Sequence, residues 1–475
     1  MRLLNAFPQI VFVSLLARGT SGSKQSDRGV HPIETIGNHF IDSVTGEPFF
    51  IRGLAYQPGG SAEVNRDSDP LSDPELCARD IPLFQQLGVN TIRIYSLNPH
   101  LNHDKCMSML AAAGIYLLLD VNSPMQTQHL NRYEPWTTYN EDYLSHIFQL
   151  VKQFSSYPNT LGVFAGNEVI NDKKSSEKSP RYVKQVVGDL KKFVKSHCAR
   201  NIPVGYSAAD DLDYRVSLSK YLECTEGDDD YSVDFYGVNS YQWCGQQTME
   251  SSGYNVLADA YKDYTKPVLL SEFGCNRVKP RIFQEVEGLF SKEMLRTFSG
   301  GIAYEYSQES NDYGLVEIDV NSGDVALLGD FKQLQERFNR IDTLAIASEK
   351  PRAKSPISCS HKYQNLNIEV DVNSTLSSEL IGKGVDIQQG QYVQLQESDL
   401  KSTRSVFDVD GRKWTGQSKI DVIRDLSLPG SSPMSPPRDE VKRGTGKQRN
   451  VGTVLERPAL IIAGAALAGA AFLVL

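Results

Sequence analysis

Two glutamates stand where buried strands are expected to end. The stretch "TLGVFAGNEVIND" (160–172) is apolar over most of its first half and then carries Asn167 and Glu168 together. A second apolar stretch, "KPVLLSEFG" (266–274), ends with Glu272. One such glutamate alone would favour a structural ion pair. Two of them favour acid–base chemistry, because one carboxyl can donate a proton while the other attacks or activates water, as glycosidic bond cleavage requires.

The elements that must position these glutamates are short apolar runs separated by helix-length segments. Eight such runs occur between residues 30 and 345, at 49–56, 90–96, 116–122, 160–169, 203–208, 234–241, 266–274 and 300–308. Buried strands alternating with helices indicate parallel βα units, and eight of them predict an α/β fold of the (β/α)8 barrel type. A doubly wound sheet is the alternative, but no glycine-rich phosphate loop follows the first run. In a barrel the carboxyl ends of the strands meet on one face, so the two glutamates are expected together.

Amphipathic segments at 75–88, 141–156 and 179–197 predict outer helices. After residue 345 the pattern changes. Residues 346–428 contain alternating segments such as "NIEVDVNST" and "QGQYVQLQE", which predict a small β-rich C-terminal appendage on the catalytic domain of 30–345. Residues 429–457 are rich in Ser and Pro and then basic, which is typical of a disordered stalk.

The two ends of the chain carry targeting patterns. Residues 1–22 combine Arg2, an apolar run and small residues, which indicates a secretory signal peptide. Residues 458–475 are apolar and follow a polar spacer with small residues, the arrangement of a GPI signal whose tail is removed. A tail-anchor helix is the alternative, but no basic residues follow the apolar run. We therefore expect the protein to be located at the outer face of the plasma membrane, attached through a GPI lipid anchor, or in the cell wall.

Charge and cysteine content narrow the classes of partner. The formal net charge of −9 disfavours nucleic acid. Seven cysteines are consistent with disulfides in a secreted chain, although the residues alone leave the pairing open. No CxxC or HxxxH spacing occurs, so no zinc site or other metal site is expected. Asn373 begins an N-glycosylation sequon.

Six motifs carry a more specific resemblance. In chain order they are "IRGLAYQPGG", "NTIRIYS", "FAGNEV", "NSYQWCG", "SEFGC" and "GGIAYEYSQE". Together they resemble glycoside hydrolase family 72, the β-1,3-glucanosyltransferases of fungal cell walls, over about residues 30–345. The resemblance implies that Glu168 is the acid/base and Glu272 the nucleophile of a retaining reaction.

Further roles are implied by the same resemblance. Donor-glucan binding is implied for Tyr95, Asn167 and Tyr304, acceptor binding for Asp210 and Arg215, and cleft lining for Gln57, Asp120, Tyr241, Trp243 and Tyr306. The adjacent Asp211 leaves the register of the acceptor assignment open. The implied disulfides are Cys77–Cys106, Cys224–Cys359 and Cys244–Cys275, which leaves Cys198 free.

The implied reaction cleaves an internal β-1,3-glucan linkage and transfers the new reducing end to the non-reducing end of another glucan, with no cofactor. Hydrolysis by a retaining endo-β-1,3-glucanase uses the same residues and is the nearest alternative, because only the second step differs. A non-catalytic glucan-binding wall protein is a third reading, disfavoured because both glutamates and Asn167 are present.

Overall fold

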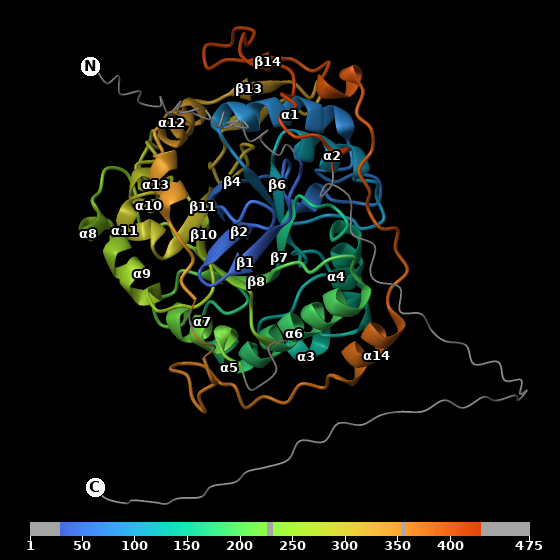
Figure 1. The fold of residues 1–475 in the computed structure, drawn as a ribbon, viewed down its shortest axis with the longest axis vertical. Coiled ribbons are helices and arrows are strands. Elements are labelled where there is room, and N and C mark those ends of the chain that lie inside the picture. Colours follow the sequence, from blue (N-terminus) through green and yellow to red (C-terminus); the bar gives the residue numbers. More distant parts are fainter. Residues whose placement is uncertain (1–28, 226–230, 354, 356, 429–475) are drawn as a thin grey trace, which may run out of the picture. The chain divides into compact units, whose positions relative to one another are not determined.

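The computed structural model describes residues 29–225, 231–353, 355 and 357–428, and its centre is a closed barrel of eight parallel strands (Figure 1). The strands are β4 (Ile51–Ala55), β5 (Thr91–Ile94), β6 (Tyr116–Asp120), β7 (Thr160–Asn167), β8 (Val204–Ala209), β9 (Phe235–Asn239), β10 (Val268–Phe273) and β11 (Phe298–Ala303). Neighbours in the chain are neighbours in the barrel, and β11 pairs with β4 to close it. The predicted barrel is therefore confirmed, and each strand overlaps one of the eight apolar runs.

Helices surround the strands as an outer ring (Figure 1). They are α1 (Pro74–Leu87), α2 (Asp104–Ala112), α3 (Pro135–Thr138), α4 (Glu141–Phe154), α5 (Lys173–Lys178), α6 (Pro180–His197), α7 (Arg215–Glu223), α8 (Met249–Ser252), α9 (Tyr254–Tyr261), α10 (Glu285–Leu289), α11 (Lys292–Leu295), α12 (Gly329–Phe338), α13 (Thr343–Ser348) and α14 (Thr375–Lys383). Local sequence sets the ends of α1: the Asp73 side chain accepts a hydrogen bond from the Glu75 amide, and Gly88 takes the left-handed conformation that ends the helix. The three predicted helices correspond to α1, α4 and α6.

A small antiparallel sheet closes the amino-terminal end of the barrel. It consists of β1 (Ile33–Ile36), β2 (His39–Asp42) and β3 (Pro48–Phe49), and in Figure 1 it lies across the ring of strands. Ile33 and Phe40 pack into an apolar cluster with Phe235 and other barrel residues. Because this sheet covers the amino-terminal end, the carboxyl ends of the strands are the open face.

The C-terminal region matches the predicted β-rich appendage only in part. Strand β14 (Val406–Phe407) pairs with β13 (Val325–Leu327), which pairs with β12 (Val316–Ile318). The stretches 367–375 and 389–397, predicted as strands, contain no strand; they run along the outside of the barrel, where the orange and red trace of Figure 1 follows the outer helices.

The contacts of this extended chain explain the difference. The Val393 amide donates to Ser108 Oγ at 2.9 Å, and the Asn367 amide donates to the Ser176 carbonyl at 3.0 Å. Lys152 Nζ donates to the Val385 carbonyl at 2.6 Å. Backbone groups that a sheet would pair with each other are thus satisfied by the outer helices and loops of the barrel.

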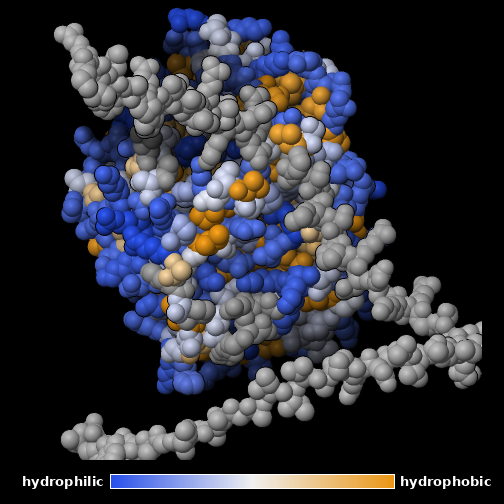
Figure 2. All heavy atoms as spheres, viewed as in Figure 1, coloured by the Kyte–Doolittle hydropathy of each residue, from blue (hydrophilic) through white to orange (hydrophobic). Residues whose placement is uncertain are grey.

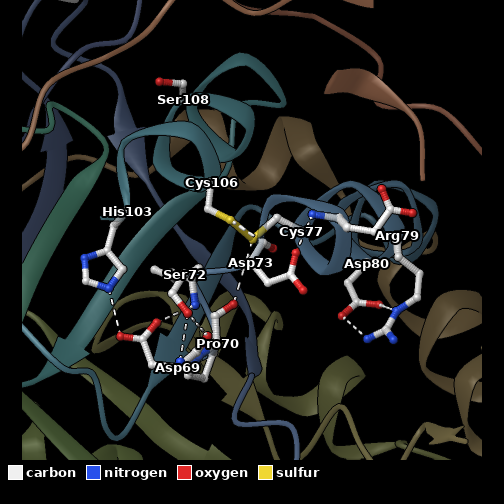
Figure 3. Close-up of a disulfide and its surroundings, with 12 residues drawn as sticks. Asp69, Pro70, Ser72, Asp73, Cys77, Arg79, Asp80, His103, Cys106 and Ser108 are labelled. Atoms are coloured by element: carbon white, nitrogen blue, oxygen red, sulfur yellow. Dashed lines mark hydrogen bonds and ion pairs between the residues drawn. A yellow bond between two sulfur atoms is a disulfide. The ribbon is translucent and has the colours of Figure 1, made fainter. Parts of the chain in front are cut away.

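The three implied disulfides are present. Cys77–Cys106 joins α1 to α2, as Figure 3 shows, beside a buried pair in which Asp69 contacts His103 at 2.8 Å. Cys224–Cys359 fastens the C-terminal chain to the end of α7. Cys244–Cys275 joins the loops that follow β9 and β10, and Cys198 is free and half-buried.

The face in Figure 2 is mostly hydrophilic, with hydrophobic residues in scattered patches. Among the described helices, none is both long and apolar enough to cross a membrane. The predicted signal peptide (1–22), stalk (429–457) and GPI-signal tail (458–475) lie outside the described residues.

Candidate active site

A cleft of about 830 Å³ opens at the carboxyl ends of the barrel strands. It is the place where a barrel brings side chains from separate strands together. Seven of the predicted site residues line it: Gln57, Tyr95, Asp120, Asn167, Glu168, Glu272 and Tyr304. Further lining residues, which the sequence did not single out, include His129, Arg132, Tyr133 and Glu305.

Glu168 leaves the strand through an unusual backbone conformation. It directly follows β7 and has a φ of +48°, in the left-handed region that side chains rarely adopt. Its amide still donates to the Ser207 carbonyl of the neighbouring strand at 2.9 Å. The sequence showed no turn signal before Glu168, and the structure supplies the turn at Glu168 itself. Such strain is typical of residues whose position serves a function.

Glu272, in β10, is held by three donors. The Tyr241 hydroxyl donates to Oε2 at 2.7 Å, and the Tyr95 hydroxyl donates to Oε1 at 3.0 Å. Arg93 Nη1 donates to the same Oε1 at 3.3 Å. These donors fix both oxygens of a carboxylate that is 8% exposed, and they favour its charged form.

Burial opposes these donors. It raises the pKa of Glu272 to about 7, assisted by the negative charge of Glu168 and resisted by Arg93 and the two tyrosine hydroxyls. The two glutamates therefore act on each other electrostatically across one cleft. Two carboxyl groups in one cleft are the groups that glycosidic bond cleavage uses as acid and nucleophile.

Arg93 is the residue that links the parts of the site, and the sequence did not single it out. Its side chain, on β5, is fully buried and donates two hydrogen bonds to Asp120, at 3.0 and 2.9 Å. It also donates to Asn167 Oδ1 at 3.0 Å, in addition to its contact with Glu272. Burial alone would lower the pKa of Arg93, but Asp120 raises it above its usual value, so the guanidinium stays charged. The only available signal was an arginine inside the apolar run "NTIRIYS".

Asn239, at the end of β9, is a second functional residue that the sequence did not single out. Its Nδ2 donates to Glu168 Oε1 at 2.8 Å and to Asn167 Oδ1 at 3.1 Å. Its Oδ1 accepts from the hydroxyls of Ser207 and Ser271 at 3.0 and 2.8 Å. The serines therefore fix the orientation of the amide, and the amide occupies one oxygen of Glu168. A proton on Glu168 is then carried by the other oxygen, Oε2.

Gln57 and Tyr304 shape the walls of the cleft. Gln57 Oε1 accepts hydrogen bonds from the backbone amides of Tyr95 and Ser96 at 3.1 and 3.0 Å, which braces the segment that carries the Tyr95 ring. The Tyr304 ring packs edge-on against Tyr95 and Tyr241, with centroids 6.2 and 6.4 Å apart. The three tyrosines form a rigid aromatic wall around Glu272.

Five predicted residues are not among those that line the cleft, namely Asp210, Arg215, Tyr241, Trp243 and Tyr306, although the Tyr241 hydroxyl donates to Glu272. Asp210 and Arg215 form an ion pair between the end of β8 and the start of α7, and Asp210 also accepts from Ser240 Oγ at 2.6 Å. Trp243 is 4% exposed and packs on Tyr254. Tyr306 is fully buried and donates to Asp80, so these two aromatic residues belong to the core instead of the cleft.

Within the described part of the chain, no group of three or more His, Cys, Asp or Glu side chains is arranged to hold a metal ion. The cleft does hold carboxyl groups that can act as acid and nucleophile. One half-buried glutamate with a free oxygen for a proton faces one clamped glutamate. This arrangement suits acid-assisted nucleophilic substitution at a sugar carbon.

Known proteins match both the sequence and the fold. Over residues 22–342 the sequence matches the family described as Glucanosyltransferase, glycoside hydrolase family 72. It is 56% identical over 405 residues to the 1,3-beta-glucanosyltransferase GAS4 of Saccharomyces cerevisiae, covering 85% of this chain and 86% of that protein. It is 41% identical over 415 residues to the 1,3-beta-glucanosyltransferase gel2 of Aspergillus fumigatus, covering 86% and 85%.

Solved structures agree. Gas2p of Saccharomyces cerevisiae in complex with laminaritriose and laminaritetraose has a TM-score of 0.63 and 38% identity, covering 72% of this chain and 77% of that one. A mutant of Gas2p with laminaritetraose and laminaripentaose has a TM-score of 0.62 and 40% identity, covering 71% of this chain and 73% of that one. The barrel, the paired glutamates and these matches lead to one conclusion: the chain belongs to the glucanosyltransferases of glycoside hydrolase family 72.

Proposed function

We propose that this protein is a retaining β-1,3-glucanosyltransferase that elongates cell-wall glucan. The observation that carries the proposal is the pair Glu168 and Glu272 in one cleft, with the second clamped by Tyr95, Tyr241 and Arg93. Relatives named as 1,3-beta-glucanosyltransferases and Gas2p structures with laminari-oligosaccharides support β-1,3-glucan as the substrate.

In the first step Glu272 attacks the anomeric carbon of a glucose unit inside the donor chain. Glu168 gives the proton on Oε2 to the leaving oxygen, so the glycosidic bond breaks as the glucosyl–enzyme ester forms. The reducing-side fragment leaves. Arg93 stays charged beneath Glu272 and keeps the attacking carboxylate oriented.

In the second step Glu168, now ionised, removes the proton from the non-reducing-end hydroxyl of an acceptor glucan. That oxygen attacks the anomeric carbon, the ester to Glu272 breaks, and the configuration is retained. Tyr95, Asn167 and Tyr304 bind the donor, together with Gln57, Asp120 and Tyr241 around them. Asp210 and Arg215 are assigned to acceptor binding, on the loop between β8 and α7.

Incubation with a laminari-oligosaccharide of defined length tests the transfer. We expect products both shorter and longer than the substrate. If all products are shorter than the substrate, the reaction is hydrolysis and not transfer. Glu168→Gln and Glu272→Gln should each lose at least about 1,000-fold in kcat and still bind the oligosaccharide. Glu285→Gln, a change at a buried glutamate that is not among the cleft-lining residues, should keep normal turnover. Normal turnover in either active-site variant would contradict the assignment.

We also propose that the protein is secreted, glycosylated at Asn373 and held at the outer cell surface by a GPI anchor. Three disulfides suit an oxidising compartment, and Asn373 is exposed just before α14. The residue patterns at 1–22 and 429–475 support entry into the secretory pathway and lipid attachment. A phosphatidylinositol-specific phospholipase should release the protein from membranes. Retention after treatment would favour a tail helix instead.

A further inference from the structure

A third carboxyl group lines the cleft, and the proposed reaction does not use it. Glu305 follows β11 by two residues and lies among the lining residues with Glu168 and Glu272. It is 4% exposed, so its carboxyl is almost completely removed from bulk water. Burying a carboxylate costs free energy unless partners compensate, so its presence at this position requires an explanation.

Three acids of this structure contact a guanidinium at 2.6 to 2.9 Å, in the pairs Asp120–Arg93, Asp80–Arg79 and Asp330–Arg281. Glu305 is held by neutral groups instead: its Oε1 accepts a hydrogen bond from the Asn311 amide at 2.8 Å, and the Tyr304 side chain also hydrogen-bonds to its carboxyl. The charges that act on it most strongly are those of two acids, Glu309 and Glu272. Burial, together with these acids, raises the pKa of Glu305 to about 7.

The surroundings of Glu305 suit a sugar. Asn311 Nδ2 also lies 3.3 Å from the Tyr304 hydroxyl, so one amide holds the carboxyl and the neighbouring ring in place. The Tyr304 ring is fixed in turn against Tyr313, at 5.2 Å between centroids. A neutral glucan brings hydroxyl donors, and a hydroxyl donating to a carboxylate forms a strong, charge-assisted hydrogen bond.

We propose that Glu305 is a further glucan-binding residue of the cleft, whose carboxylate accepts a hydrogen bond from a hydroxyl of the sugar beside the nucleophile Glu272. The inference rests on the proposed function and adds a contact to it. Asn311 acts as a positioning residue for this contact, and the glucan hydroxyl supplies a further donor to the carboxylate.

Binding, measured without turnover, tests the proposal. Laminaritetraose is titrated by calorimetry into the Glu168→Gln protein and into the same protein with Glu305→Ala, Glu305→Gln or Glu285→Gln added. Glu285 is the matched control, because it is also 4% exposed with a pKa raised by burial to about 7, yet is not among the lining residues. We expect Glu305→Ala to weaken binding at least about tenfold, and Glu285→Gln to change it less than about twofold.

A series of laminaritetraose analogues, each lacking one ring hydroxyl, separates direct contact from loss of structure. One analogue should bind more weakly than laminaritetraose to the parent. The same analogue and laminaritetraose should bind to Glu305→Ala with equal affinity. The inference would be overturned if Glu305→Ala and the parent bound laminaritetraose with equal affinity. It would also be overturned if every analogue lost the same amount of affinity in both proteins. If Glu305→Ala does not fold, the isosteric Glu305→Gln is judged on the analogue series alone. A parent that binds no laminaritetraose would overturn the proposed function itself, and with it this inference.

Discussion

Replacing Glu272 by glutamine should stabilise the folded protein at neutral pH while it abolishes turnover. The carboxyl is 8% exposed, and burial raises its pKa to about 7 from an ordinary value of 4.5. The folded state therefore holds the proton more tightly than the unfolded chain does. Below pH 4.5 the carboxyl is protonated in both states and does not lower the free energy of unfolding. Its destabilising effect grows between pH 4.5 and 7 and reaches its full size above pH 7.

The size of the effect follows from that difference. The interval from 4.5 to 7, at about 1.4 kcal/mol for each pH unit, corresponds to about 3 kcal/mol in the free energy of unfolding. Glutamine is uncharged at every pH and keeps the shape of the side chain, and the Tyr241 hydroxyl can turn to accept from its amide. The variant should therefore match the parent near pH 4 and exceed it by up to about 3 kcal/mol near pH 8.

Equilibrium unfolding in guanidinium chloride at constant ionic strength, with the disulfides intact, measures this difference at each pH. Glu47→Gln removes one exposed carboxylate outside the cleft and controls for net charge; it should stay within about 0.5 kcal/mol of the parent. A Glu272→Gln protein that is less stable than the parent at pH 8, or a difference that does not vary with pH, would refute the reasoning. Arg93 and the two tyrosine hydroxyls would then outweigh burial.

Three further changes test the supports of the site. Asn239→Ala removes the donor 2.8 Å from Glu168, and steady-state kinetics should show kcat lowered about 10- to 100-fold; an unchanged kcat would exclude a positioning role. Arg93→Met leaves Asp120 buried without its cation, which should cost about 3–5 kcal/mol in a denaturant titration, and a loss below about 1 kcal/mol would contradict this. Cys359→Ser opens a disulfide between residues 135 apart, so the unfolding free energy should fall by up to about 5 kcal/mol, whereas an unchanged midpoint would show that the C-terminal chain is held by its other contacts.

Much of the barrel and the position of both glutamates could be predicted from the sequence. Buried parallel strands are apolar on both faces, so each of the eight strands stands out as a continuous apolar run. A polar residue at the end of such a run is equally visible, which is why Asn167, Glu168 and Glu272 could be named and placed on one face. Cysteine pairing was not readable in this way and came from the resemblance, because pairing depends on which loops meet in space.

What the sequence by itself determined is the order of strands and helices and the presence of two glutamates at strand ends. Only the tertiary structure decided where the other side chains point. Every residue of β5 is buried, so period-two patterning cannot tell whether Arg93 faces the barrel interior or the helices. Tyr306, three residues beyond the end of β11, lies in the core and donates to Asp80, although it was expected to line the cleft. The alternating stretches after residue 366 read as strands, yet a strand forms only where a partner strand is available, and here outer helices and loops take the backbone hydrogen bonds instead.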